Sequence, residues 1–212
     1  MNPGYLSLLL MVVTLILFAS GWKDIVMRGI TSKVILLFFI SWLICMNLSV
    51  PVGGGRISLC FGVLLITILY VLWRVHGTVY RVHLLSVGAL LGSISFFMLE
   101  TIHLVPKLIL GSSEISMGLT IGLLVSLLTR QPAVQIASLS IGLMLAEVYH
   151  GYLHRNYLGF QLGFQTFQDR WWLTLFITRT FSLVLLFSMQ ACKKSVLWLS
   201  DGIRRRHSGD SE

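Results

Sequence analysis

Seven long apolar runs, separated by short polar connections, are the feature that most restricts how this chain can fold. They cover residues 5–20, 34–50, 57–73, 84–105, 115–129, 133–153 and 171–190. A transmembrane helix needs about 17–25 predominantly apolar residues, so runs of this kind predict a polytopic bundle of membrane helices. Because the runs are continuous and do not alternate in hydrophobicity, an outer-membrane β-barrel is disfavoured. The predicted fold class is therefore all-α, an integral membrane bundle with about seven transmembrane helices.

Charged residues are too scarce to cover a water-facing surface. They make up 11% of the chain, against roughly 25% in soluble domains. The formal net charge is +8, but the basic residues lie in short connections and in the tail, where they set topology and contact lipid. We therefore expect the lipid bilayer as a partner, with anionic lipids at its cytoplasmic face, and we do not expect nucleic acid.

The basic residues also predict an orientation. With the N-terminus outside, the outer connections hold Arg56, Lys107, Arg155 and Arg170. The cytoplasmic side then holds 11 of the 16 basic residues: Lys23, Arg28, Lys33, Arg74, Arg81, Arg130, Lys193, Lys194, Arg204, Arg205 and Arg206. This bias predicts a multi-pass protein of the cell membrane with its C-terminus in the cytoplasm. The fifth run is the weakest span, and the later orientation inverts if that run does not cross.

The chain divides into a predicted bundle and a tail. Residues 1–190 form the transmembrane bundle, and residues 191–212 form a basic cytoplasmic tail that we expect to be disordered.

The connection before the seventh run contains Leu-Gly-Phe-Gln twice. Phe160, Phe164 and Phe167 recur at helical spacing there, which predicts a short helix lying in the membrane interface. A lid or docking surface is the alternative. The interfacial helix is favoured because Trp171 and Trp172 follow at once as an aromatic anchor.

Two Glu-x-x-His turns carry the chemistry that can be argued from this sequence. Glu100 and His103 end the fourth run, while Glu147, His150 and His154 end the sixth. Both runs point outward in the predicted topology, so the five side chains should lie at a similar depth near the outer leaflet. Carboxylate and imidazole groups on facing helices form a ligand set for zinc, iron or manganese. Bundle sites with two metals need further carboxylates, so a mononuclear site is left open.

Arg179, inside the seventh run, provides the structural alternative. A charge within a membrane segment needs a partner, and the predicted depth of Arg179 is close to that of Glu147. An intramembrane ion pair between these two residues is the favoured interpretation, with the histidines hydrogen-bonded to hydroxyl groups. A third interpretation places Glu100, Glu147 and Arg179 along a proton or substrate path.

Short stretches spread over most of the chain point to one family. They are Gly21-Trp22-Lys23, Asn47-Leu48-Ser49 before a proline, Tyr80-Arg81-Val82-His83-Leu84-Leu85, Leu99-Glu100 and Ala146-Glu147. In these features the chain resembles the YphA family, small polytopic membrane proteins of endospore-forming Gram-positive bacteria. The resemblance implies a link with sporulation and spore envelope assembly. It implies no catalytic residue, because the family has no established activity.

The function expected is that of a membrane scaffold that interacts with other membrane or envelope proteins. The rivals are a metal-dependent membrane enzyme that uses the Glu/His cluster and a small transporter. Whether the protein is an enzyme is left open, since the sequence has no Gly-rich phosphate loop, nucleophile elbow or HExxH motif.

Overall fold

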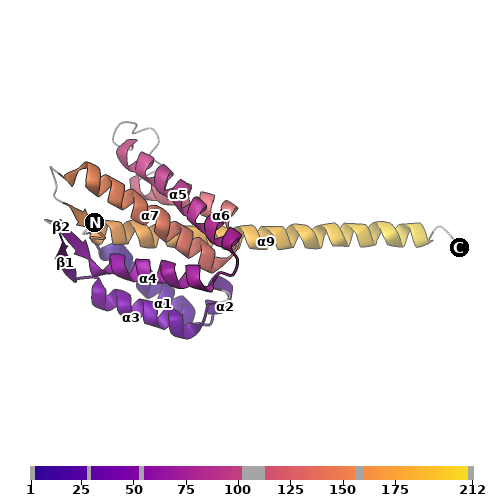
Figure 1. Cartoon of the computed structure of the whole chain (residues 1–212). Coiled ribbons are helices and arrows are strands. Elements are labelled where there is room, and N and C mark those ends of the chain that lie inside the picture. Colours follow the sequence, from indigo (N-terminus) through magenta and orange to yellow (C-terminus); the bar gives the residue numbers. More distant parts are fainter. Residues whose placement is uncertain (1–2, 28–29, 53–54, 102–112, 156–159, 210–212) are drawn as a thin grey trace.

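Each of the seven apolar runs contains a helix in the computed structural model of the chain (Figure 1). The structure describes residues 3–27, 30–52, 55–101, 113–155 and 160–209, with side chains as far as Lys194 apart from Asp24 and Ser113. The predicted all-α class is confirmed. The helices are α1 (Tyr5–Ala19), α2 (Lys23–Val26), α3 (Ser32–Cys45), α4 (Leu59–Arg74), α5 (Thr78–Thr101), α6 (Ser113–Leu128), α7 (Pro132–Leu153) and α9 (Gln165–Gly209).

The helices differ in whether they are long enough to cross a membrane. Within the described residues, α5, α7 and the Gln165–Lys194 part of α9 are long and apolar enough to do so. The shorter apolar helices contain 10–17 residues, at or below the lower limit of about 17 for a span. They are Tyr5–Ala19, Ser32–Cys45, Leu59–Arg74 and Glu114–Leu128. The bundle is therefore compatible with membrane insertion.

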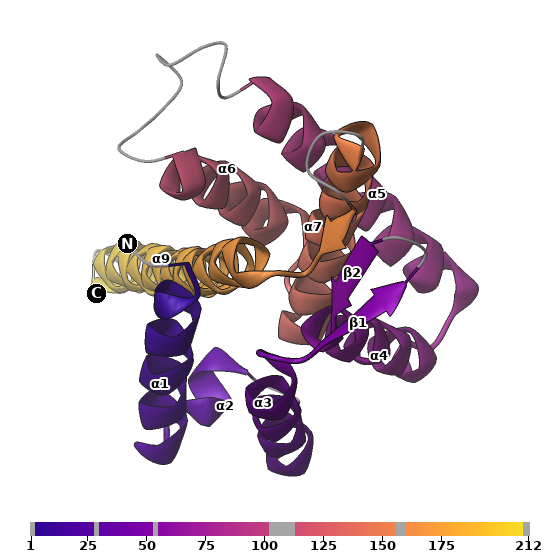
Figure 2. The ribbon, with the colours of Figure 1, turned by 90° about the vertical axis from the view of Figure 1, so that its left-hand side faces the viewer.

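Consecutive helices run in opposite directions, so their connections gather at two ends of the bundle (Figure 1). The hairpin end holds the strands, the start of α1 and the ends of α5 and α7. The α2 end holds α2, the α4–α5 and α6–α7 connections, and the point where α9 leaves the bundle. Figure 2 looks onto the hairpin end and shows α7 between α4, α5, α6 and α9, with α1 to α3 on one side.

A small sheet closes the hairpin end. Strand β1 (Ser49–Val52) pairs antiparallel with β2 (Gly55–Ser58), and β2 pairs in parallel with β3 (Gln161–Leu162). The sequence predicted only an exposed turn around Pro51. Pro51 lies on β1, an outer strand of the sheet, where its missing N–H removes no required bond.

The short, separate interfacial helix predicted within residues 155–170 is not found in the described residues. Residues 160–164 contain β3 and Gly163, whose φ of 73° interrupts any helix, and residues 165–170 are the first turns of the long helix α9. Phe167 lies on α9 and is only 1% exposed, so it packs in the core instead of entering a membrane interface.

The predicted aromatic anchor is also wrong, because Trp171 and Trp172 are only 1% and 2% exposed. Helix α9 begins six residues before the seventh run, so both tryptophans lie within the bundle. Trp171 stacks on Trp42 of α3 with 5.0 Å between ring centroids, and its Nε1 donates to Ser140 Oγ of α7 at 3.1 Å. These contacts tie α9 to α3 and α7.

Helix α9 can begin before the apolar run because the polar residues of its first turns have hydrogen-bond partners in the bundle. Asp169 is 6% exposed and accepts hydrogen bonds from the backbone N–H groups of Gly4 (2.7 Å) and Ser7 (2.6 Å). The amides at a helix N-terminus have no intrahelical acceptor and favour a negative charge. Asp169 thus caps α1 and fixes the first turns of α9 beside it.

Helix α9 also continues through the predicted tail. It is unbroken from Gln165 to Gly209, so the expected disorder of the tail is wrong over the described residues. No change of structure marks the predicted boundary between residues 190 and 191. The helix projects far beyond the bundle at the α2 end (Figure 1).

Glycines allow the closest helix contacts, because a residue without a side chain lets two helix backbones approach. A Cβ atom on Gly142 of α7 would lie 2.8 Å from Leu91 Cβ and 3.2 Å from the Gly88 carbonyl oxygen, both on α5. A Cβ on Gly122 of α6 would lie 2.9 Å from Ile177 Cγ2 of α9. Helices α5 and α7 therefore touch backbone to backbone, which brings their ends together.

Candidate functional site

Three of the predicted site residues meet at the hairpin end. Glu100 comes from the last turn of α5, while His150 and His154 lie one turn apart on α7. The close approach of α5 and α7 places the carboxylate opposite both imidazoles. We call Glu100, His150 and His154 the triad.

The ligand atoms of the triad converge. His150 Nδ1 lies 2.8 Å from Glu100 Oε1, and His154 Nε2 lies 3.2 and 3.3 Å from the two Glu100 oxygens. The imidazole centroids are 4.6 Å apart. The three side chains are between 30% and 36% exposed, so the triad is reachable from outside the bundle.

The triad can hold a metal ion. One ligand atom from each residue lies within 4.8 Å of the other two. A tetrahedral site with ligand bonds of about 2.0–2.2 Å separates its ligand atoms by about 3.3–3.5 Å, so small shifts of side chains would suffice. Two nitrogens and one oxygen suit zinc, iron or manganese.

Glu147 also belongs to the predicted set, but its carboxylate is not part of the triad. The Glu147 carboxylate lies one turn earlier on α7 and faces Arg170 of α9, with 3.3 Å between Arg170 Nη1 and Glu147 Oε2. Those two side chains are 14% and 16% exposed. His103 lies outside the described residues.

The predicted ion pair between Arg179 and Glu147 is replaced by other contacts. Arg179 donates through Nη1 to the side-chain oxygen of Gln135 and through Nη2 to the Val26 carbonyl oxygen. The prediction measured the depth of Arg179 from Trp171. Because α9 starts at Gln165, Arg170 occupies the level of Glu147, and Arg179 reaches the α2 end.

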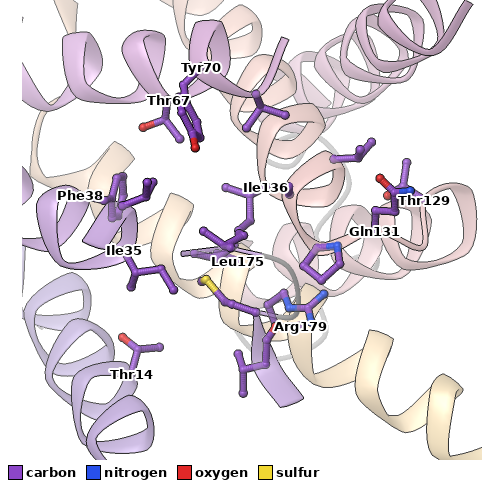
Figure 3. Close-up of a pocket in the computed structure, with 18 of the residues that line it drawn as sticks. Thr14, Ile35, Phe38, Thr67, Tyr70, Thr129, Gln131, Ile136, Leu175 and Arg179 are labelled. Carbon is purple, nitrogen blue, oxygen red and sulfur yellow. Dashed lines mark hydrogen bonds between the residues drawn. The ribbon is translucent and has the colours of Figure 1, made fainter. Parts of the chain in front are cut away.

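A large cavity inside the bundle was not predicted. It has a volume of about 970 Å³ and is bounded by α1, α3, α4, α7 and α9. Figure 3 shows Ile35 and Phe38 facing Thr67 and Tyr70 across it, with Arg179 at one side. Periodicity locates helices but not the gaps between them, so no pattern in the sequence indicates this space.

The sequence did contain one signal for a special environment at Arg179. An arginine inside an apolar run is costly, so its presence indicates that the guanidinium has polar partners. The structure identifies Gln135 as one of them. The sequence could not identify this partner, because that choice depends on where α9 begins.

Comparison of the sequence with protein-family models and curated proteins, and of the structure with solved structures, gives no match.

Proposed function

We propose that this chain is a seven-span integral membrane protein that binds a divalent transition-metal ion at its outer end through Glu100, His150 and His154. The observation that carries the proposal is the convergence of one carboxylate and two imidazoles from separate helices, all within 4.8 Å of one another. Three protein ligands leave a fourth position for water or substrate, as in catalytic zinc sites.

The arrangement of connections supports the predicted orientation. Lys23, Arg74 and Arg130 all lie at the α2 end, and α9 carries Lys193 and Lys194 beyond that end. Basic residues gather on the cytoplasmic side of membrane proteins. We therefore assign the α2 end to the cytoplasm and the triad to the outer face of the cell membrane.

A nearby contact supports a fixed site. The Glu147–Arg170 pair joins α7 to α9 one turn below His150. This contact restrains the end of α7 that carries the two imidazoles.

The decisive measurement is metal content by mass spectrometry on the full chain purified in detergent. We expect about one zinc, iron or manganese ion per chain. A His150→Ala/His154→Ala variant should lose this ion because it lacks both imidazoles. The matched control is His76→Ala/His83→Ala, which removes two histidines at the α2 end and should retain the ion.

A second variant keeps the test valid if the His150→Ala/His154→Ala protein does not fold. Glu100→Gln keeps the shape of the side chain and removes its charge, so bound metal should fall roughly tenfold or more while the protein stays monodisperse. Metal absent from the wild type, or present equally in Glu100→Gln, would contradict the proposal.

A scaffolding role is the second candidate, and it is supported by α9. Beyond the bundle this helix exposes apolar side chains, including Val184 (55%), Phe187 (55%) and Met189 (58%). An exposed apolar surface of this kind marks contact with lipid or another protein. Its partners would be membrane or envelope proteins, in sporulation if the resemblance to the YphA family holds.

A further inference from the structure

Arg179 is a buried cation without a counter-charge among the described residues. Its side chain is 7% exposed, and its hydrogen bonds go to the neutral oxygens of Gln135 and Val26. Its Nε atom is buried and has no hydrogen-bond partner. A buried charge is costly unless it is paired, so the arrangement calls for an anion that the described side chains do not supply there.

The guanidinium lies in the wall of the central cavity. Arg74, Arg130, His76 and His83 line the same cavity, all at the α2 end. Among the described residues that line it, none is acidic. The α2 end of the cavity is therefore complementary to a negatively charged group.

Most of the remaining wall is apolar, with a few hydroxyl groups and Gln131. Ile35 and Phe38 of α3, Val71 of α4, Ile136 of α7 and Leu175 of α9 face the interior. The hydroxyl groups there are mostly engaged locally, as Thr67 Oγ1 donates to the Val63 carbonyl oxygen. A hydrocarbon chain would find few unpaired polar groups along this wall.

The cavity is open at the side of the bundle. Leu37 of α3 and Ile66 of α4 line it and are 64% and 67% exposed. In the proposed orientation these side chains face the bilayer, so a molecule could enter from the membrane without passing through water.

We propose that this cavity binds one anionic phospholipid drawn from the cytoplasmic leaflet. Its phosphate lies beside Arg179, and its acyl chains follow the apolar walls of α3, α4 and α7. Arginine forms strong, charge-assisted hydrogen bonds with phosphate oxygens, and a volume of about 970 Å³ is in the range of ligand pockets.

The test is native mass spectrometry of the full chain in detergent, titrated with phosphatidylglycerol or phosphatidylcholine. Wild type should bind one phosphatidylglycerol with an affinity roughly tenfold or more above that for phosphatidylcholine. Arg179→Gln should lose this preference. The matched control Arg155→Gln removes an exposed arginine at the hairpin end and should keep the preference.

A variant that fills the cavity tests the same site without removing charge. Thr67→Trp places a large ring in the space that Thr67 faces in Figure 3, so it should weaken binding of both lipids roughly tenfold. The Thr67→Trp variant also tests lipid binding in the cavity if the Arg179→Gln protein does not fold.

Three outcomes would overturn the proposal. They are equal affinity of the wild type for the two lipids, an unchanged preference in Arg179→Gln, and unchanged binding in Thr67→Trp. Inorganic phosphate serves as the competitor. If millimolar phosphate displaced phosphatidylglycerol completely, the site would be one for a soluble anion. If phosphatidylglycerol stayed bound in millimolar phosphate, the result would support a lipid site.

Discussion

At the scale of single residues, Trp171 joins three helices. Its ring stacks on Trp42 of α3 and lies 5.1 Å from the ring of Trp172, and its indole N–H bonds to Ser140 of α7. Such a side chain combines a large buried area with a satisfied donor. Trp171 is therefore one of the side chains that hold α9 against α3 and α7.

Trp171→Ala should destabilise the fold by about 3–5 kcal/mol, because the surrounding helices cannot close the resulting cavity. Thermal unfolding in detergent would show this as a lower Tm. Trp73→Ala is the control, since Trp73 is 80% exposed and its loss should change Tm little. Equal decreases in Tm for the two variants would show that Trp171 contributes no special packing between the helices.

The candidate ligands could be predicted residue by residue only in part. Glu100, His150 and His154 were identified because charged and imidazole groups in apolar runs are rare and the helical spacing places them on one face. The partner of Glu147 could not be identified, because Arg170 counted as a connection residue. Its place in α9 depends on Asp169 binding the start of α1, a contact between residues far apart in the chain.

At the scale of elements, the contact between α5 and α7 builds the triad. Gly88, Gly92 and Gly142 allow the two backbones to approach, and the ends of the same helices carry Glu100 and His150. A disturbance of this contact should therefore reach the metal site through rigid helices.

Gly142→Ala places a Cβ atom 2.8 Å from Leu91 Cβ and 3.2 Å from backbone atoms of Gly88 and Gly92. Overpacking of this kind should cost about 1–3 kcal/mol, and bound metal should fall with it. Gly62→Ala is the matched control. No atom of another segment lies within 4 Å of its added Cβ. Alanine in a helix is also more favourable than glycine by about 1 kcal/mol, so this variant should be at least as stable as the wild type.

Tm and metal content, measured on both variants, check this prediction. A Gly142→Ala protein with the Tm and metal content of the wild type would mean that α5 and α7 separate freely. A loss of stability in Gly62→Ala would mean that any added methyl group disturbs the bundle.

The elements themselves were predictable to different degrees. Long apolar runs located α1, α3, α4, α5, α6, α7 and the 171–190 part of α9, because helical periodicity and length are local properties. The strands were missed because all three are short, and because β3 pairs with the local β1–β2 hairpin only after α7 has returned to the same end. The start of α9 was missed for the same reason, as its polar residues are stabilised by distant partners.

At the scale of the whole molecule, the odd number of apolar helices places the two termini at opposite ends (Figure 1). The short helices α1, α3, α4 and α6 lie beside longer ones, so they cross together as a bundle in our proposal. The orientation then follows from the basic residues alone.

Labelling of single cysteines with a membrane-impermeant maleimide tests the orientation. In a background without other cysteines, Arg155→Cys at the hairpin end should react in intact cells. Cys192 is exposed on α9 and should react only after the membrane is permeabilised, because it lies on the cytoplasmic side. The cysteine-free protein controls for background, and the reverse pattern would contradict the proposed topology.

The continuity of α9 has a mechanical consequence. A helix of 45 residues is a rod of roughly 68 Å at a rise of about 1.5 Å per residue. It is held near its start by Asp169 and Arg170 and about a third of the way along by Arg179, and its other end projects beyond the bundle (Figure 1). A force that tilts the projecting end of this helix should first shift the contacts of Arg179 and then those of Asp169 and Arg170. In the proposed topology, a force applied to α9 on the cytoplasmic side would therefore be transmitted along the helix to the outer side.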